Sequence, residues 1–142
     1  MASKGRRYKT VVVDGYEVLI GKGDADNDEL TFALAAPEDF WLHVAGGVAG
    51  SHVVIRNPDK HETLPDEIVR RAAELAAWHS KARRAGRVEV HVSKAADVRK
   101  PRGAAAGEVA LRQWRRVRVQ PTPEGSGRSS PASGRPGGAT DV

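Results

Sequence analysis

DFWLHVAGGVAGSHVVIR, residues 39–56, contains two runs of strand-forming residues on either side of a glycine-rich turn. The first run is Phe40–Val44, and the second is Ser51–Arg56. Two such runs around a short turn predict an antiparallel hairpin. In the first run Trp41 and His43 share one face, because side chains alternate along a strand. The rest of the chain is placed around this hairpin.

A second hairpin is predicted upstream, where an Asp-Gly pair separates Tyr8–Val13 from Tyr16–Gly21. A type I′ turn needs positive φ at both central residues, and this pair adopts it readily. Residues 21–28 consist of turn-forming residues and predict a loop. For residues 29–35 the pattern allows either a strand or the start of a short helix.

One long helix is predicted from about residue 64 to residue 85. Thr63 can cap its start, and Gly86 takes the position just after the last turn, where glycine commonly ends a helix. One stripe at helical spacing consists of Ile68, Ala72, Leu75, Ala76 and His79. At 1.5 Å per residue the helix would be roughly 30 Å long.

The region after this helix is predicted to form further strands. Arg87–Val92 alternates valines with polar residues, as a half-buried strand does. Residues 97–107 predict a basic loop, and Glu108–Leu111 and Trp114–Val119 are predicted as a last pair of strands. Most links are too short for crossover helices, which favours antiparallel pairing. The predicted fold class is therefore α+β, with a largely antiparallel or mixed sheet and one long helix.

The two ends of the chain differ from its middle. We expect a flexible N-terminus at residues 1–7, one domain at residues 8–119 and a disordered tail at residues 120–142. The tail is rich in Pro, Gly and Ser and buries too little apolar surface to offset its ordering entropy. The 142 residues include no cysteine, which excludes disulfides and thiolate metal sites. Neither a signal-peptide pattern nor a membrane-spanning run is found, so we expect a cytoplasmic protein without a membrane partner.

Charge is distributed unevenly along the chain, although the net charge is only +5. Residues 1–80 contain 9 Lys and Arg against 13 Asp and Glu, whereas residues 81–118 contain 12 against 3. This asymmetry favours a polyanion such as nucleic acid as the partner. The alternative is a solvated basic face that only keeps the protein in solution.

The first hairpin also raises the possibility of catalysis. Asp39, His43 and His52 together are a known type of metal-ligand set. They would support a small metal-dependent phosphoester hydrolase, but their spacing matches no mechanistic signature. Ser51 and His52 point to opposite faces of a strand, and the motif G-x-S-x-G is absent. We therefore assign no catalytic residue, metal or cofactor, and keep the hydrolase as an alternative.

Two further features are compatible with RNA. Exposed amides in the turn AGGVAGS, residues 45–51, can form a nest for a phosphate, although a flexible turn explains the same residues. Trp41 and Trp114 have polar or basic neighbours and could stack on an unpaired base. Core packing is the simpler explanation for either tryptophan in a small domain.

Six short segments, taken together, are specific in their order and spacing. They are DGYEVLIGK at residues 14–22, NDEL at residues 27–30, DFWLH at residues 39–43, GSHVVI at residues 50–55, AAELAAWHSKAR at residues 72–83 and VRKPRGAAAGEV at residues 98–109. From about residue 8 to residue 119 the chain resembles the NFACT-R domain family. This family is the RNA-binding module of NFACT proteins in ribosome-associated quality control.

The resemblance implies RNA binding without catalysis, with tRNA or ribosomal RNA as partner and the large ribosomal subunit as a further one. Together with the basic charge it assigns RNA contact to His43, Ser51, His52, Lys81, Arg83, Arg99, Lys100 and Arg102. The histidines and Ser51 would donate hydrogen bonds to phosphate or ribose, or order the turn that does. A third hypothesis is a protein-interaction module that docks on a ribosomal partner.

The chain departs from the family pattern in three respects. The turn before GSH usually carries a basic residue and a proline, but here it reads AGGVA at residues 45–49 and is one residue longer. His79 stands where the family tends to have an aromatic residue. The N-terminal NFACT domain and the coiled-coil arms do not fit into 142 residues, so a stand-alone module is expected.

Overall fold

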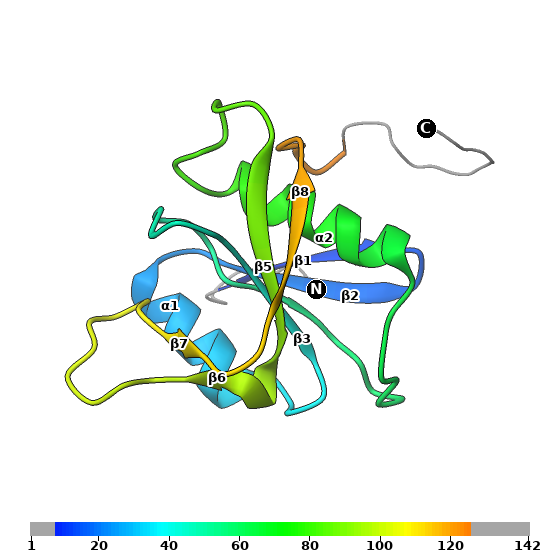
Figure 1. Cartoon of the computed structure of the whole chain (residues 1–142). Helices are drawn as coiled ribbons and strands as arrows, with labels where there is room; N and C mark the ends of the chain where they lie inside the picture. The colour runs from blue at the N-terminus through cyan, green and yellow to red at the C-terminus, as the bar shows by residue number, and fades with distance from the viewer. Residues whose placement is uncertain (1–7, 126–142) are drawn as a thin grey trace.

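A six-stranded sheet forms the centre of the protein in the computed structural model, which describes residues 8–125 (Figure 1). Its strands lie in the order β1-β2-β4-β3-β5-β8, and all neighbours are antiparallel. Their bounds are β1 (Tyr8–Val13), β2 (Tyr16–Gly21), β3 (Phe40–Val44), β4 (Val53–Ile55), β5 (Val88–Lys94) and β8 (Arg115–Val119). A separate ribbon pairs β6 (Val98–Arg99) with β7 (Ala110–Leu111). The predicted α+β class with a largely antiparallel sheet is confirmed.

Both predicted hairpins are present. β1 and β2 pair along their whole length, and the turn residues Asp14 and Gly15 have φ of 48° and 88°, as a type I′ turn requires. β3 and β4 pair around the glycine-rich turn, with Trp41 opposite Val54. β4 also pairs with β2, so the two hairpins lie side by side in one sheet.

The long helix, α2 (Asp66–Trp78), is shorter than predicted, because the residues after it pair with the glycine-rich turn. The Ser51 N–H donates to the His79 carbonyl at 2.9 Å. The Lys81 N–H donates to the Ala49 carbonyl at 2.9 Å. These long-range bonds replace the helical hydrogen bonds that local propensity alone would continue to residue 85.

A short helix stands where a loop was predicted. α1 (Asp24–Glu29) continues directly into a π-helical turn, η1 (Leu30–Leu34), so the loop prediction is wrong from residue 24 onward. Asn27 and Leu30 are buried, and Leu30 packs in one core cluster with Trp41. Tertiary contacts therefore hold a helix that its acidic, turn-forming sequence does not favour.

The two faces of the sheet are covered by different elements (Figure 1). On one face α2 packs against a large apolar cluster that includes Leu42, Val90 and Leu75. On the other, η1 and the β6–β7 ribbon enclose a smaller cluster with Leu19, Trp41 and Val54. The sheet residues of this smaller cluster come from β2, β3 and β4, which leaves the β5–β8 part of that face open.

The last strands do not pair with each other as predicted. β7 pairs with β6 beside the sheet, whereas β8 pairs with β5 at the sheet edge. The predicted pairing was wrong because each of these strands pairs with a strand that precedes both of them in the sequence. A third short element, the 3-10 helix η2 (Ala95–Asp97), connects β5 to β6.

Part of the expected disordered tail packs on α2. Arg71 donates to the carbonyls of Thr122 and Pro123 at 3.2 and 2.7 Å, and Glu124 accepts a hydrogen bond from Lys9. The structure thus differs from the expectation as far as residue 124. Residues 126–142 of that segment and the predicted flexible N-terminus, residues 1–7, lie outside the described residues. Within the described range, neither helix has the length and apolar character needed to cross a bilayer.

Candidate nucleic-acid interface

A chain of hydrogen bonds runs through the smaller core and ends at the loop between β6 and β7. Trp41 Nε1–H donates to Thr31 Oγ1 at 3.1 Å, and Thr31 Oγ1 lies 2.8 Å from His52 Nδ1. His52 Nε2 lies 3.2 Å from the Gly107 carbonyl oxygen. Because a carbonyl only accepts, His52 carries its proton on Nε2, and its Nδ1 accepts from the Thr31 hydroxyl. Each polar side-chain group in this series of hydrogen bonds therefore has a partner inside the protein.

The two histidines of the β3–β4 hairpin are neutral at pH 7. Burial lowers the pKa of His52 to about 4, and the neighbouring His43 acts in the same direction. Burial also lowers the pKa of His43, whose ring centroid is 5.2 Å from that of His52. Neither ring therefore supplies positive charge to a partner.

His52 and Ser51 are placed to order the adjoining turn. His52 is only 1% exposed, so it does not reach a ligand in this structure. The Ser51 hydroxyl donates to the Gly21 carbonyl at 2.6 Å. These contacts agree with the predicted role of ordering the turn, while Ser51 is half-buried and its contact with RNA stays a prediction. His43 is half-buried on the same face.

Asn27, which sequence reasoning did not select, links α1 to this turn. Its Nδ2 donates to the Gly50 carbonyl at 3.2 Å, and its Oδ1 accepts from the His52 N–H at 3.0 Å. Gly21 makes room for it, because a Cβ there would lie 2.1 Å from the Asn27 Oδ1. Asp28 next to it accepts from the Gly107 N–H at 3.1 Å. The one sequence signal for both was the NDEL segment, to which no role was attached.

The glycine-rich loop, residues 45–50, presents free backbone amides. Gly46 and Gly47 both have positive φ, of 81° and 73°. In the described part of the chain, no acceptor takes the N–H groups of Gly46, Gly47, Val48 or Ala49. Successive unpaired amides in a turn form a concavity that suits an anion.

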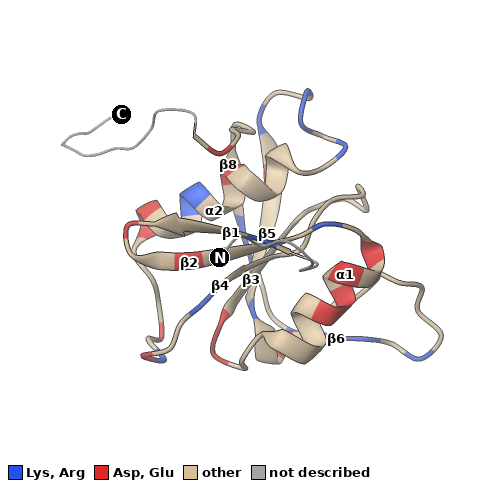
Figure 2. Ribbon diagram, turned by 180° about the vertical axis from the view of Figure 1, so that it is seen from behind, with Lys and Arg blue, Asp and Glu red and all other residues tan. Residues whose placement is uncertain are grey.

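The helix-end loop, residues 79–87, lies next to the glycine-rich loop and is basic (Figure 2). Lys81, Arg83, Arg84 and Arg87 are exposed, and no carboxylate of the described residues lies within 4.0 Å of them. The Arg83 guanidinium lies over the Trp78 ring, 4.9 Å from its centroid. These cations are therefore available to a phosphate backbone.

The long loop, residues 100–109, contributes fewer free cations than predicted. Lys100 donates to Asp28 and to the Glu108 carbonyl, each at about 3 Å, so its charge is largely used within the protein. Arg99 and Arg102 are exposed and have no carboxylate partner among residues 8–125. Gly107 in this loop is the point where His52 and Asp28 attach it to the domain.

The three loops lie along one side of the molecule, with the glycine-rich loop between the two basic ones (Figures 1 and 2). The cations near β8 do not join this group. Arg112 pairs with Asp97 at 2.6 Å, and Arg116 pairs with Glu89 at 3.3 Å. The basic charge is thus divided between the loop side and the open sheet face.

The geometry does not support the alternative hydrolase. The Asp39 carboxylate accepts N–H bonds from Asn57 and Ala36, at 2.8 and 2.9 Å, and is 1% exposed. It lies one residue before β3, whereas His43 is near the other end, roughly 13 Å along the strand. No group of three His, Asp or Glu side chains able to hold a metal occurs within the described residues.

Together, the fold and these loops define a small α+β domain whose basic loops surround a buried polar network. The chain belongs to the NFACT protein RNA binding domain family, whose model matches residues 6–113. This confirms the family indicated by the six sequence segments.

Relatives of known name agree with this assignment. The chain is 42% identical over 120 residues to the Rqc2 homolog RqcH of Streptococcus suis (strain 05ZYH33), covering 84% of this chain and 21% of that protein. It is 40% identical over 108 residues to the Rqc2 homolog RqcH of Bacillus subtilis (strain 168), covering 75% and 18%. The chain therefore spans about a fifth of the length of these relatives.

A solved structure shares the fold. It is the C-terminal part of the fibronectin/fibrinogen-binding protein from Streptococcus suis, with a TM-score of 0.74 and 38% identity. The match covers 82% of this chain and 46% of that one.

Proposed function

We propose that this domain binds a folded RNA, tRNA or ribosomal RNA, in ribosome-associated quality control, with the large ribosomal subunit as its setting. One observation carries the proposal. Exposed cations without carboxylate partners lie on both sides of a glycine-rich loop with free amides. One buried network holds this loop and the long loop, and backbone hydrogen bonds join the helix-end loop to the glycine-rich loop. Family membership supports the same function.

The arrangement suits recognition of shape more than of sequence. Guanidinium and ammonium groups together with backbone amides bind phosphate oxygens, which every nucleotide has. The neutral histidines fix the loops and add no charge of their own. RNA helices are recognised mainly through phosphates, 2′-hydroxyls and their shape, so a folded RNA fits this surface.

The test removes one cation from each basic loop. The variant Lys81→Gln with Arg102→Gln should lower affinity for labelled tRNA about tenfold at low salt, because two phosphate contacts are lost. Measured between about 50 and 300 mM salt, the slope of log K against log salt should become less steep by about 1.5. The matched control is Lys60→Asn with Arg70→Gln, which removes the same charge from other parts of the surface. Asparagine suits residue 60 because φ there is 58°.

Three results would overturn the proposal. The first is an absence of tRNA and ribosomal RNA binding by the wild-type protein. The second is affinity that does not change with salt. The third is an equal loss in the control variant, which would mean that total charge, rather than these loops, attracts the RNA. Binding to a ribosomal protein with no effect of Lys81 and Arg102 would favour the protein-docking hypothesis instead.

A further inference from the structure

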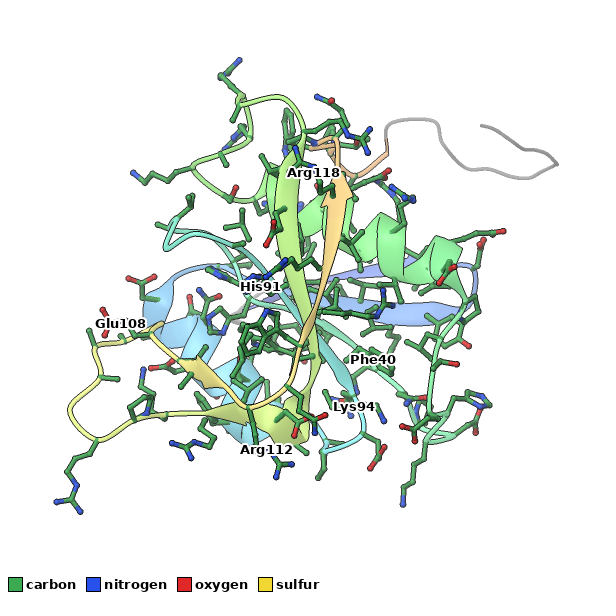
Figure 3. All side chains as sticks on the ribbon, in the orientation of Figure 1. Phe40, His91, Lys94, Glu108, Arg112 and Arg118 are labelled. Carbon is green, nitrogen blue, oxygen red and sulfur yellow. The ribbon has the colours of Figure 1, made fainter. Side chains whose placement is uncertain are left out.

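The open part of the sheet carries an exposed tryptophan among arginines. Trp114 stands just before β8 and is 47% exposed. Its ring tilts against His91 of β5, with the two ring centroids 5.6 Å apart. In Figure 3 His91 lies between Arg112 and Arg118 along β5 and β8. Core packing does not explain a tryptophan that is left half open on this face.

The arginines beside Trp114 can take a new partner. Arg116 pairs with Glu89 at 3.3 Å while its side chain stays 69% exposed. Arg112 pairs with Asp97 and is 66% exposed. The Arg116–Glu89 pair contributes little, because water screens the charges and the long side chains lose freedom. Arg112 donates from Nε and Nη2 to the largely buried Asp97 and keeps its remaining N–H groups for a phosphate. A phosphate arriving here would therefore displace only the weak Arg116–Glu89 pair.

We propose that Trp114 stacks on an unpaired nucleobase of the bound RNA, while Arg112 and Arg116 bind the adjacent phosphates. The inference rests on the proposed function and adds to it the kind of RNA element that is recognised: a loop, a bulge or a single-stranded end. Stacking needs an accessible ring face on the base, which a paired and stacked base does not offer. It tolerates any base, in keeping with recognition by shape.

Charge decides between RNA and a protein as the occupant of this face. Tryptophan and arginine are also enriched at protein–protein interfaces. On this side of β8 and just before it, however, three arginines, Arg112, Arg116 and Arg118, stand against two carboxylates, Glu89 and Asp97. A hollow lined by residues 112–116 adjoins the indole. This combination of a basic rim and an aromatic platform is complementary to a nucleotide.

The test measures the binding of two RNA probes to the 142-residue chain. One is an RNA hairpin with a loop of unpaired uridines, and the other is a fully paired duplex with the same number of phosphates. Trp114→Ala should weaken binding of the hairpin roughly 5- to 150-fold and leave duplex binding within about twofold. Trp114→Phe should retain most of the affinity, because phenylalanine still stacks. Phe32→Ala is the matched control, since Phe32 is 43% exposed in a helical turn without arginine.

The outcomes separate this inference from the proposed function. If wild-type protein binds both probes and Trp114→Ala changes neither, only the stacking inference fails, and the face would belong to a protein partner. An equal loss for both probes would also overturn it, because stacking requires an unpaired base. The salt slope should not change in Trp114→Ala, whereas it should in the Lys81 and Arg102 variant. If the wild-type protein binds labelled tRNA but neither probe, the stacking inference fails alone, and if it binds neither the probes nor tRNA and ribosomal RNA, the proposed function itself fails.

Discussion

The face of the sheet under α2 is filled by aliphatic side chains and Phe40, whereas the opposite face combines a smaller apolar cluster with hydrogen-bonded side chains from Trp41 to His52. The first face buries apolar area, which stabilises the domain without regard to direction. The second uses directional bonds that reach Gly50 and Gly107. The comparison indicates that one face provides stability and the other positions the loops that we propose bind RNA.

The largest effect should come from truncating the apolar face. Leu42 is fully buried in the α2 cluster, so Leu42→Ala removes apolar contacts and leaves a cavity. The free energy of unfolding should fall by about 2–5 kcal/mol in urea titrations. RNA affinity, measured where the variant is still folded, should stay close to wild type. Val12→Ala is the control, because Val12 is 65% exposed and should change stability by less than about 0.5 kcal/mol. A large loss of RNA affinity in folded Leu42→Ala would break the division between the faces.

The second effect is a pH dependence of the free energy of unfolding, which we expect from the buried histidines of the polar face. The pKa of His52 is about 4 in the folded protein and about 6.5 when unfolded, so the unfolded chain binds its proton first as pH falls. Stability from this residue is present above about pH 6.5 and is lost as pH falls to about 4, by up to about 3 kcal/mol. His43 adds a change of the same sign. Unfolding free energies measured from pH 7 to pH 4 should show the fall.

A variant without the titrating ring isolates the contribution of His52. His52→Gln should be less stable at pH 7, because the amide does not reproduce the bonds to both Thr31 and Gly107. Its stability should nevertheless depend less on pH between 6.5 and 4. Equal pH dependence in both proteins would mean that His52 is not held neutral. Glu124 does not affect this comparison. Its pKa is lowered to about 2, because hydrogen bonds from Lys9 and His79 outweigh the effect of burial, so its contribution to stability falls only below about pH 4.5 and does so equally in both proteins.

The same comparison explains how much the sequence could predict. The two hairpins depend on local signals, the Asp-Gly turn and the alternation around Trp41, and both were predicted. The end of α2 was not, because it is set by bonds between Ala49 and Lys81, which are far apart in the chain. α1 was missed for a similar reason, since its buried Asn27 is held by Gly50 and His52, which lie between β3 and β4.

The site shows the same limit. Lys81 and Arg102 were selected from charge and are exposed, but charge alone could not reveal that Lys100 is engaged by Asp28. Asn27 and Thr31 were missed, because Asn27 bonds Gly50 and Thr31 bonds His52, each more than 20 residues away in the sequence. A buried amide or hydroxyl has no periodicity that a sequence pattern can detect. The family segments alone pointed to this region.

The smallest expected change in stability is that of Asn27→Ala, which should also lower RNA affinity. This variant tests most directly whether the polar face of the sheet positions the loops. Asn27→Ala leaves the His52 N–H and the Gly50 carbonyl without their partner, which should cost about 1–3 kcal/mol. The glycine-rich loop then loses its link to α1. Its amides should no longer be preorganised, and RNA affinity should fall severalfold although Asn27 is buried and does not reach a ligand.

A matched variant separates loop ordering from lost stability. Val69→Ala, on α2, should cost a similar amount of unfolding free energy through lost packing, because Val69 is 1% exposed. Since it contacts the opposite face, it should leave RNA affinity unchanged. Hydrogen exchange of the His52 amide, which donates to Asn27 Oδ1, should be faster in Asn27→Ala and unchanged in Val69→Ala. If both variants reduce RNA affinity to the same degree, global stability governs binding and the polar face has no separate positioning role.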